Sequence, residues 1–320
     1  MLDKYSLKLR QAMPLKDKIR FTERRIHEWV EHFGVNGCYV SFSGGKDSTV
    51  LLHIVRSLYP DIEAVFVDTG LEYPEIRKFV KTFDNVTILR PEMRFDKVLE
   101  KYGYPIGSKL ISRRIADARK GCKYAIDMLN GQYGGGKSFY NIPQWKFLLD
   151  APFKISHKCC DVMKKKPAHD YHKKTGKVPF IATMADESIL REAKYLQNGC
   201  NGFNLKIPTS TPIAFWTEQD ILEYIDTYKI PIASVYGDVI KTDKYHTTGC
   251  QRTGCMFCGF GCHLEKYPNR FQRLAETHPK QYDYIIHTLG MGEVLDFIGV
   301  EYRPNINKGQ MKLLLESEGK

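Results

Sequence analysis

Cys38-Tyr-Val-Ser-Phe-Ser-Gly-Gly-Lys-Asp-Ser-Thr-Val-Leu-Leu-His53 is the stretch that decides the fold. Its first five residues have the β-branched and aromatic character that is typical of a short buried strand. After a Ser-Gly-Gly turn, apolar residues recur at the spacing of one helix face: Val50, Leu51, Ile54, Val55 and Leu58. The stretch therefore predicts a strand that turns through two glycines directly into a helix.

The glycine turn predicts an anion-binding site. The first amides of a helix have no partner inside the helix, and the helix dipole favours negative charge there. Gly44 and Gly45 let the backbone approach a phosphate without a Cβ in the way, and Lys46 adds a positive charge. The alternative interpretation is a Gly-Gly turn that only links the strand to the helix.

The spacing excludes the mononucleotide P-loop. That motif has a glycine six positions before its lysine, where this sequence has Val40, and a Ser or Thr after it, where this sequence has Asp47. Residues 43–48, Ser-Gly-Gly-Lys-Asp-Ser, instead resemble the PP-loop of ATP pyrophosphatases, which cut ATP between its α- and β-phosphates. The resemblance implies ATP with Mg²⁺ as cofactors, and Lys46, Asp47 and Ser48 as catalytic residues.

Composition limits the class of protein. The chain has 320 residues and a net charge of +11, and 42% of its residues are hydrophobic, enough for one large domain with an appendage. No apolar run approaches membrane-spanning length and the first residues lack a signal-peptide core, so we expect a cytoplasmic protein with no membrane partner. In that compartment the nine cysteines favour metal ligation or thiol chemistry over disulfides. The positive charge favours a polyanionic partner, or is only a solvated surface.

Strand and helix patterns alternate along the chain. Residues 62–67, 86–89 and 178–182 are typical of strands, whereas 16–33 and 74–83 are typical of helices. This alternation predicts an α/β fold with a doubly wound, mainly parallel sheet. We expect three segments along the chain: an N-terminal helical segment (1–36), a nucleotide-binding domain (37–240), and a cysteine-rich, helical appendage (241–320).

Polar residues follow two of these strands. Asp68 and Thr69 come directly after the strand at 62–67, and Glu187 and Arg191 follow the strand at 178–182. Ligands of open α/β sheets lie beyond the carboxyl ends of the strands, so Asp68 would face the same crevice as the glycine turn. Its carboxylate would bind ribose or a metal ion, or else close the strand in an Asx turn. Both interpretations stay open.

Residues 103–157 form a basic insertion in the nucleotide-binding domain. A glycine-rich loop (131–137) and the aromatic residues Phe139, Tyr140 and Trp145 follow its positive residues. Such a segment could hold tRNA or DNA by phosphate contacts and base stacking. A charged solvent face with a surface loop is the simpler alternative. The positive residues are Lys109, Arg113, Arg114, Arg119, Lys120 and Lys123.

Two groups of cysteines predict a metal site. Cys159 and Cys160 are adjacent, so they cannot bridge each other without strain, but both sulfurs can ligate one cluster. The second group consists of four cysteines within thirteen residues, which could make a tetrahedral zinc site by themselves. Alternatively, its two central members join the adjacent pair around a [4Fe-4S] cluster, and the outer two are spare thiols. The second group consists of Cys250, Cys255, Cys258 and Cys262.

Together these segments resemble the phosphoadenosine phosphosulfate reductase family over nearly the whole chain. The resemblance implies an adenine nucleotide α-hydrolase-like fold. From the adenylylsulfate-type members it implies a [4Fe-4S] cluster on four thiols: Cys159, Cys160, Cys255 and Cys258. It also implies a nucleotide site that comprises Ser41, Phe42, Ser43, Gly44, Gly45, Lys46, Ser48, Asp68, Thr69, Glu187 and Arg191.

Three departures from the reductase pattern favour an enzyme that cuts ATP itself. Reductases end in a cysteine that attacks the sulfate sulfur, whereas this chain has no cysteine after Cys262. Met184 stands where reductases carry an arginine, and its thioether cannot bind an anion. Reductases also tend to have a degraded PP-loop, whereas this loop is intact and includes Lys46.

We therefore expect an enzyme that adenylylates a substrate, releases AMP and pyrophosphate, and supports sulfur transfer to a nucleic acid or a small molecule at the iron–sulfur cluster. A sulfur donor or reductant protein is an expected partner, and a homodimer is one candidate assembly. The alternatives are a sulfonucleotide reductase and a non-catalytic nucleotide-binding regulator with a zinc knuckle. The tail is expected to be helical near 269–276, 279–288 and 291–298, and frayed in its last dozen residues.

Overall fold

The computed structural model describes residues 2–304, and the predicted fraying of the last dozen residues lies outside them. The chain divides into two compact units. The first unit comprises Met1–Glu92 and Met163–Cys255, and the second comprises Met93–Val162 and Met256–Lys320. Each unit thus combines two separate stretches of chain, whereas the segments expected from the sequence follow one another. No helix within residues 2–304 is long and apolar enough to cross a membrane.

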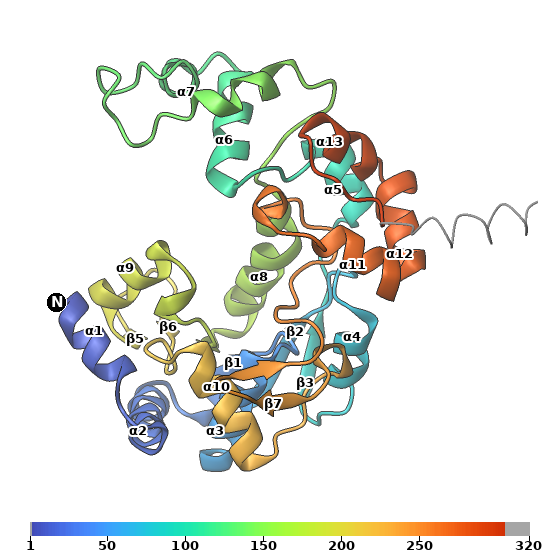
Figure 1. Cartoon of the computed structure of the whole chain (residues 1–320). Coiled ribbons are helices and arrows are strands. Elements are labelled where there is room, and N and C mark those ends of the chain that lie inside the picture. Colours follow the sequence, from blue (N-terminus) through green and yellow to red (C-terminus); the bar gives the residue numbers. More distant parts are fainter. Residues whose placement is uncertain (1, 305–320) are drawn as a thin grey trace, which may run out of the picture. The chain divides into compact units, whose positions relative to one another are not determined.

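A six-stranded sheet forms the centre of the first unit (Figure 1). Its order is β3-β2-β1-β4-β6-β5, and all neighbouring pairs are parallel except β5 with β6. The predicted doubly wound, mainly parallel α/β fold is therefore confirmed. The strands are β1 (Cys38–Ser41), β2 (Glu63–Val67), β3 (Val86–Leu89), β4 (Val178–Ile181), β5 (Asn201–Gly202) and β6 (Thr209–Ser210).

β1 lies inside the sheet because it is apolar on both faces. Cys38, Tyr39 and Val40 are all buried, as expected for a strand with helices over both faces. Val40 lies opposite Ala64 of β2 on one side and Phe180 of β4 on the other. The first strand of the chain therefore becomes an inner strand of the sheet.

The helices of the first unit follow the predicted patterns closely. The patterns at 16–33 and 74–83 correspond to α2 and α4, and α4 ends three residues earlier than predicted. α2, α3 and α10 pack against one another. The helices are α1 (Lys4–Gln11), α2 (Leu15–Phe33), α3 (Lys46–Leu58), α4 (Pro74–Val80), α8 (Lys166–Thr175), α9 (Ile189–Asn198) and α10 (Glu218–Tyr228), with a hairpin of β7 (Val239–Lys241) and β8 (Tyr245–Thr247).

A buried ion pair fixes the start of α10 to α2. The Lys18 ammonium donates to both carboxylate oxygens of Asp220 at 2.6 Å and to the carbonyl of Gln11 at 2.7 Å. Asp220 also accepts the backbone N–H of Thr217 at 2.7 Å, which caps the helix. Because an unpaired buried charge is costly, this contact strongly restricts where the first turn of α10 can lie.

The turn between β1 and α3 requires glycine at position 44. Gly44 has φ +71°, a conformation that costs an L-residue about 1–2 kcal/mol. A Cβ at this position would lie 2.7 Å from Val80 Cγ2 and 2.8 Å from Ile76 Cγ2, both on α4. Gly44 therefore lets the chain turn and also lets α4 approach the turn.

The second unit is mainly helical, and the predicted tail helices are confirmed. The stretch predicted as one helix at 279–288 continues from α12 into a π-helical turn at Tyr284–Thr288. The basic insertion contributes α6, α7 and a 3₁₀ segment at Pro143–Asp150, which pack together. The helices are α5 (Phe95–Tyr102), α6 (Lys109–Ala118), α7 (Lys123–Leu129), α11 (Arg270–Thr277), α12 (Pro279–Asp283) and α13 (Met291–Phe297).

The turn at Gly44 can be tested by substitution. We expect Gly44→Ala to lower the free energy of unfolding by about 2–4 kcal/mol, because strain and overpacking against α4 add. Gly176→Ala is the matched control: Gly176 has φ +70° but no atom within 4 Å of an added Cβ, so only the strain of about 1 kcal/mol applies. Urea denaturation followed by tryptophan fluorescence measures both, and equal losses would contradict the packing argument.

Candidate functional site

Three loops of the first unit lie at one edge of the sheet. They follow β1, β2 and β4, whose carboxyl ends point the same way because the three strands are parallel. The chain adds β2 and β3 on one side of β1 and then β4 on the other, so the direction of winding reverses between β1 and β4. Ligands of open α/β sheets bind outside such a reversal point. The loops are residues 42–45, 68–73 and 182–188.

The turn before α3 presents a helix N-terminus without a side-chain cap. Gly45 at the N-cap is extended, and the serines on either side hold the turn. The hydroxyls of Ser43 and Ser48 share a hydrogen bond of 3.0 Å, and the Ser48 hydroxyl also donates to the carbonyl of Gly45 at 2.9 Å. These two serines therefore shape the turn, and the dipole of the 13-residue helix leaves positive potential at its start.

Lys46 is buried and held by protein groups. Its side chain is only 5% exposed, and its ammonium donates to the carbonyl of Gln251 at 2.8 Å. Glu218 on the first turn of α10 lies 3.0 Å from the same ammonium. A phosphate that used Lys46 would have to take the place of these two partners.

The side chain of Tyr236 is hydrogen bonded to the first amide of α3. Its hydroxyl accepts the backbone N–H of Lys46 at 3.3 Å and is also hydrogen bonded to the hydroxyl of Thr253. Burial raises the pKa of Tyr236 to about 12, so the phenol stays neutral. A neutral phenol oxygen is a weaker partner for a helix N-terminus than an anion is.

Asp47 lies beside Lys46 with one oxygen buried. The side chain is 30% exposed, but its Oδ1 atom is buried and has no hydrogen-bond partner. Burial raises the pKa of Asp47, Lys46 opposes that rise, and the carboxylates of Glu187 and Glu218 add to it. Arg252 also acts to lower this pKa. The turn thus carries a carboxylate that lacks a full set of partners.

After β2, the predicted site residues contact residues of their own loop and of α4. Asp68 accepts the N–H of Gly70 at 3.2 Å, which is the Asx turn considered from the sequence, and its other oxygen pairs with Arg77 at 2.9 Å. The hydroxyl of Thr69 donates to the buried carboxylate of Glu72 at 2.8 Å. Asp68 therefore forms the Asx turn in this structure, and its role in nucleotide binding stays a prediction.

After β4, two predicted site residues pair with each other. Arg191 forms an ion pair with Glu187, which also accepts the N–H of Met184 at 3.0 Å. The hydroxyl of Ser188 accepts the N–H of Arg191 and caps α9. Met184 is buried in the apolar core, where an arginine would be hard to accommodate.

Ser41 and Phe42 lie where β1 ends. The ring of Phe42 is buried and packs edge-on against Phe83 at 5.0 Å. Its N–H donates to the carbonyl of Val65 at 2.9 Å. The side chain of Phe42 therefore belongs to the core.

The cysteines divide between the two units. Cys250 and Cys255 belong to the first unit, and the other four cysteines of the predicted metal groups belong to the second. Within the second unit, the Cys262 thiol donates to the carbonyl of Gly259 at 3.1 Å, and burial raises its pKa to about 11. Among residues 2–304, no three His, Cys, Asp or Glu side chains are arranged so that they could hold one metal ion.

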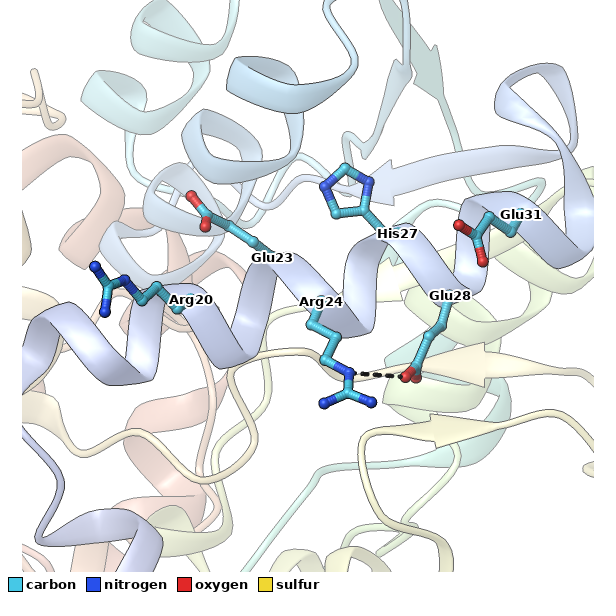
Figure 2. Close-up of a pocket in the computed structure, with 6 residues that line it drawn as sticks. All are labelled: Arg20, Glu23, Arg24, His27, Glu28 and Glu31. Carbon is cyan, nitrogen blue, oxygen red and sulfur yellow. Dashed lines mark ion pairs between the residues drawn. The ribbon is translucent and has the colours of Figure 1, made fainter.

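A surface hollow on α2 is not a second site. All six of its lining residues come from one face of that helix (Figure 2). Arg24 and Glu28 form an ion pair of 3.7 Å there, one helical turn apart. Exposed pairs of this kind contribute little, so this is the charged solvent face expected of an amphipathic helix. The lining residues are Arg20, Glu23, Arg24, His27, Glu28 and Glu31.

The sequence interpretation missed the residues that surround Lys46. Glu218, Tyr236, Gln251 and Thr253 lie between 172 and 207 positions further along the chain. Gln251 and Thr253 lie between Cys250 and Cys255, but only the cysteines of that stretch were predicted as site residues. No local signal in the sequence could have identified these four, because their role comes from tertiary contacts.

Comparison with known proteins gives one family. The phosphoadenosine phosphosulfate reductase domain family matches residues 37–120 and 131–259. An uncharacterized protein of Methanocaldococcus jannaschii is 26% identical over 255 residues, and the match covers 78% of this chain and 46% of that protein. A second uncharacterized protein of that organism is 44% identical over 72 residues, 21% of this chain and 15% of that protein. This chain thus matches less than half the length of either relative.

Reductases also resemble the chain, at lower identity. Adenosine 5'-phosphosulfate reductase of Geobacillus kaustophilus is 25% identical over 210 residues, 65% of this chain and 68% of that protein. Among solved structures, the phosphoadenylyl-sulfate reductase of Candida auris in its phosphate complex is similar, and the match covers 77% of this chain and 98% of that chain. Its TM-score is 0.40 and its identity 12%.

Tyr236→Phe tests whether the α3 N-terminus receives an anion. Removing the hydroxyl frees the Lys46 amide, so we expect pyrophosphate to bind about 3- to 10-fold more tightly, given a net hydrogen bond of roughly 1 kcal/mol. Tyr224→Phe is the matched control, because its hydroxyl is hydrogen bonded to His53 further along α3. Isothermal titration calorimetry measures both. Weaker binding by Tyr236→Phe would mean that the hydroxyl itself contacts the anion.

Proposed function

The chain belongs to the phosphoadenosine phosphosulfate reductase domain family, and on that premise we propose that residues 43–48 bind ATP and cleave it to AMP and pyrophosphate. The observation that carries the proposal is the α3 N-terminus: it follows a left-handed glycine, has no side-chain cap, and begins with a lysine. A helix start of this kind favours a phosphate because its amides and dipole both act on negative charge.

The proposed reaction transfers an adenylyl group. An acceptor oxygen attacks the α-phosphorus, which forms a new P–O bond while the bond to the α,β-bridging oxygen breaks. Pyrophosphate leaves with the bonding electrons, and the acceptor loses its proton to solvent. Stabilising the charge that develops on the leaving group is the largest contribution that such a site can make.

Lys46 would supply that stabilisation by exchanging partners. In the nucleotide-free protein its charge is balanced by Glu218. The β- and γ-phosphates of ATP offer more negative charge at the same helix end, so the ammonium would turn from Glu218 and Gln251 to the nucleotide. The Oδ1 atom of Asp47, buried without a hydrogen-bond partner, fits a partner of the Mg²⁺ that accompanies ATP.

The proposal also includes a sulfur-transfer step after adenylylation, and this step depends on the cysteines. Cys159, Cys160, Cys255 and Cys258 are the ligands that the family resemblance implies for a [4Fe-4S] cluster. Within residues 2–304, no three His, Cys, Asp or Glu side chains are arranged to hold one metal ion, so the four ligands are supported by the sequence resemblance alone. A sulfur nucleophile would then attack the acceptor atom that carries the adenylyl oxygen: a bond to sulfur forms, the bond to that oxygen breaks, and AMP leaves with the bonding electrons. This second step requires a separate sulfur donor.

The second candidate function is sulfonucleotide reduction. It is favoured by the relatives that are named adenosine 5'-phosphosulfate reductases. The buried Met184 counts against it, because a thioether cannot bind the anionic part of the substrate. Release of sulfite from adenosine phosphosulfate with a thiol reductant would support this alternative.

Product analysis with ATP tests the main proposal. We expect AMP and pyrophosphate, with a rate on the order of 100-fold lower in Lys46→Met. Because that substitution leaves Glu218 without its partner, the double variant Lys46→Met/Glu218→Gln controls for folding and should be equally inactive. Glu218→Gln alone should keep the activity, since it removes only the competing carboxylate. Formation of ADP in place of AMP would refute the proposal.

Metal analysis tests the cluster separately. If the four cysteines bind [4Fe-4S], anaerobically purified protein should be brown and contain about four iron ions per chain. Cys255→Ser/Cys258→Ser should lose this iron, whereas Cys122→Ser should retain it, because Cys122 lies outside both cysteine groups. Colourless protein with one zinc ion per chain would contradict the cluster and favour the zinc alternative.

A further inference from the structure

The loop that follows α7 holds two aromatic side chains in solvent. Phe139 is 96% exposed and Tyr140 is 56% exposed, and their rings lie 6.2 Å apart at 73°. In Figure 1 this loop extends from α7 on the side away from α5 and α13, which belong to the same unit. Each ring therefore has free surface on which a ligand can stack.

The loop is fastened at its base. The side-chain amide of Asn141 donates to the carbonyl of Tyr133 and accepts the N–H of the same residue, both at 3.1 Å. The N–H of Ile142 donates to the carbonyl of Met128 at 2.9 Å, which returns the chain to the end of α7. The aromatic pair is thus held outside the core by a closed loop, and it forgoes the burial that normally stabilises a phenylalanine.

The helices beside this loop carry excess positive charge. Residues 103–157 contain nine Lys and Arg residues but only three Asp and no Glu. Arg119 has a structural role, since its guanidinium donates to the carbonyls of Leu148, Ala151 and Phe153. Arg114 contacts Asp117 and Tyr124. Lys154 donates to the carbonyl of Glu100 at 3.0 Å. The other exposed lysines are Lys109, Lys120, Lys123, Lys137 and Lys146.

Lysines and aromatic rings lie within a short distance of each other. Lys137 is two residues before Phe139, Lys123 is the first residue of α7, and Lys120 lies in the turn just before it. α7 has seven residues and is therefore about 10 Å long, so its start and the loop at its end are within reach of one short strand. We call Lys120, Lys123, Lys137, Phe139 and Tyr140 the loop surface.

We propose that the loop surface binds a single-stranded nucleic acid. Unpaired bases stack on Phe139 and Tyr140, and the lysines contact phosphates. A duplex does not fit this chemistry, because its bases are already stacked and cannot cover the rings. A membrane fits less well, because two rings among glycines and lysines offer little apolar area for insertion. The binding stands by itself; only the idea that this strand is the acceptor for AMP rests on the proposed function.

Fluorescence anisotropy with a labelled 20-nucleotide strand tests the binding. We expect the single strand, as RNA or as DNA, to bind more tightly than the duplex of the same sequence. For three phosphate contacts, affinity should fall roughly 20-fold between 50 and 200 mM salt. A duplex that binds as tightly as the single strand would overturn the proposal.

Matched variants locate the binding surface. Phe139→Ala/Tyr140→Ala should weaken binding roughly 10-fold or more, whereas Tyr5→Ala, a 69% exposed tyrosine of the first unit, should not change it. Lys120→Glu/Lys123→Glu should weaken binding much more than Lys173→Glu/Lys174→Glu, a pair of exposed lysines on α8. Equal losses in the two lysine variants would mean that overall charge is responsible, and would overturn the proposal. Equal binding by Phe139→Ala/Tyr140→Ala and Tyr5→Ala would mean that no base stacks on the two rings, and would also overturn it.

Two further measurements separate this proposal from its competitors. Lys46→Met/Glu218→Gln should bind the strand normally, so loss of ATP cleavage and loss of strand binding can be observed independently. Vesicles that contain phosphatidylserine should not bind. Vesicle binding that depends on Phe139, together with strand binding that does not, would assign the loop surface to a membrane instead.

Discussion

The missing side chain at Gly44 is the constraint on which the candidate site depends. With φ +71° and with α4 so close that a Cβ would overlap Val80 and Ile76, no other residue allows β1 to turn into α3 at this point. The turn directs the N-terminus of α3 toward the edge where the loops after β1, β2 and β4 lie. The positive end of the helix, Lys46 and Asp47 are all positioned by that one turn.

Burial of the Lys46 ammonium makes distant parts of the first unit interdependent. A buried charge needs partners, and Lys46 obtains them from Glu218 on α10 and from the carbonyl of Gln251. α10 is itself fixed by the buried pair of Lys18 and Asp220. The ion pair between α2 and α10 therefore helps to place the carboxylate that balances the site, although neither of its members is near a recognisable motif.

The positive side chains that the structure describes in the second unit are of two kinds, arginines held in protein contacts and exposed lysines. Arg119 binds three carbonyls and Arg114 binds Asp117 and Tyr124, so these guanidinium groups stabilise the packing of α6 with its neighbours. The lysines are exposed and remain accessible to an external partner. This division follows from chemistry: a guanidinium can satisfy several acceptors in a fixed plane, whereas an ammonium is more easily left in water.

The sequence by itself determined β1 to β4, the helices α2, α3 and α4, the tail helices and the Gly-Gly turn, because each depends on local spacing and on backbone preferences. It also identified Lys46 and Asp47, which belong to a continuous motif. It did not indicate the short strands β5 to β8 or the helices α1, α8 and α9. Only the tertiary structure decided that Asp68 closes an Asx turn, that Arg191 pairs with Glu187, and that Tyr236 and Gln251 contact Lys46. The contacts of Lys46 join residues 190 and 205 positions apart, so they depend on how the sheet and helices pack, which no local pattern encodes. The contacts of Asp68 and Arg191 are local, but the sequence left open which partner each side chain takes.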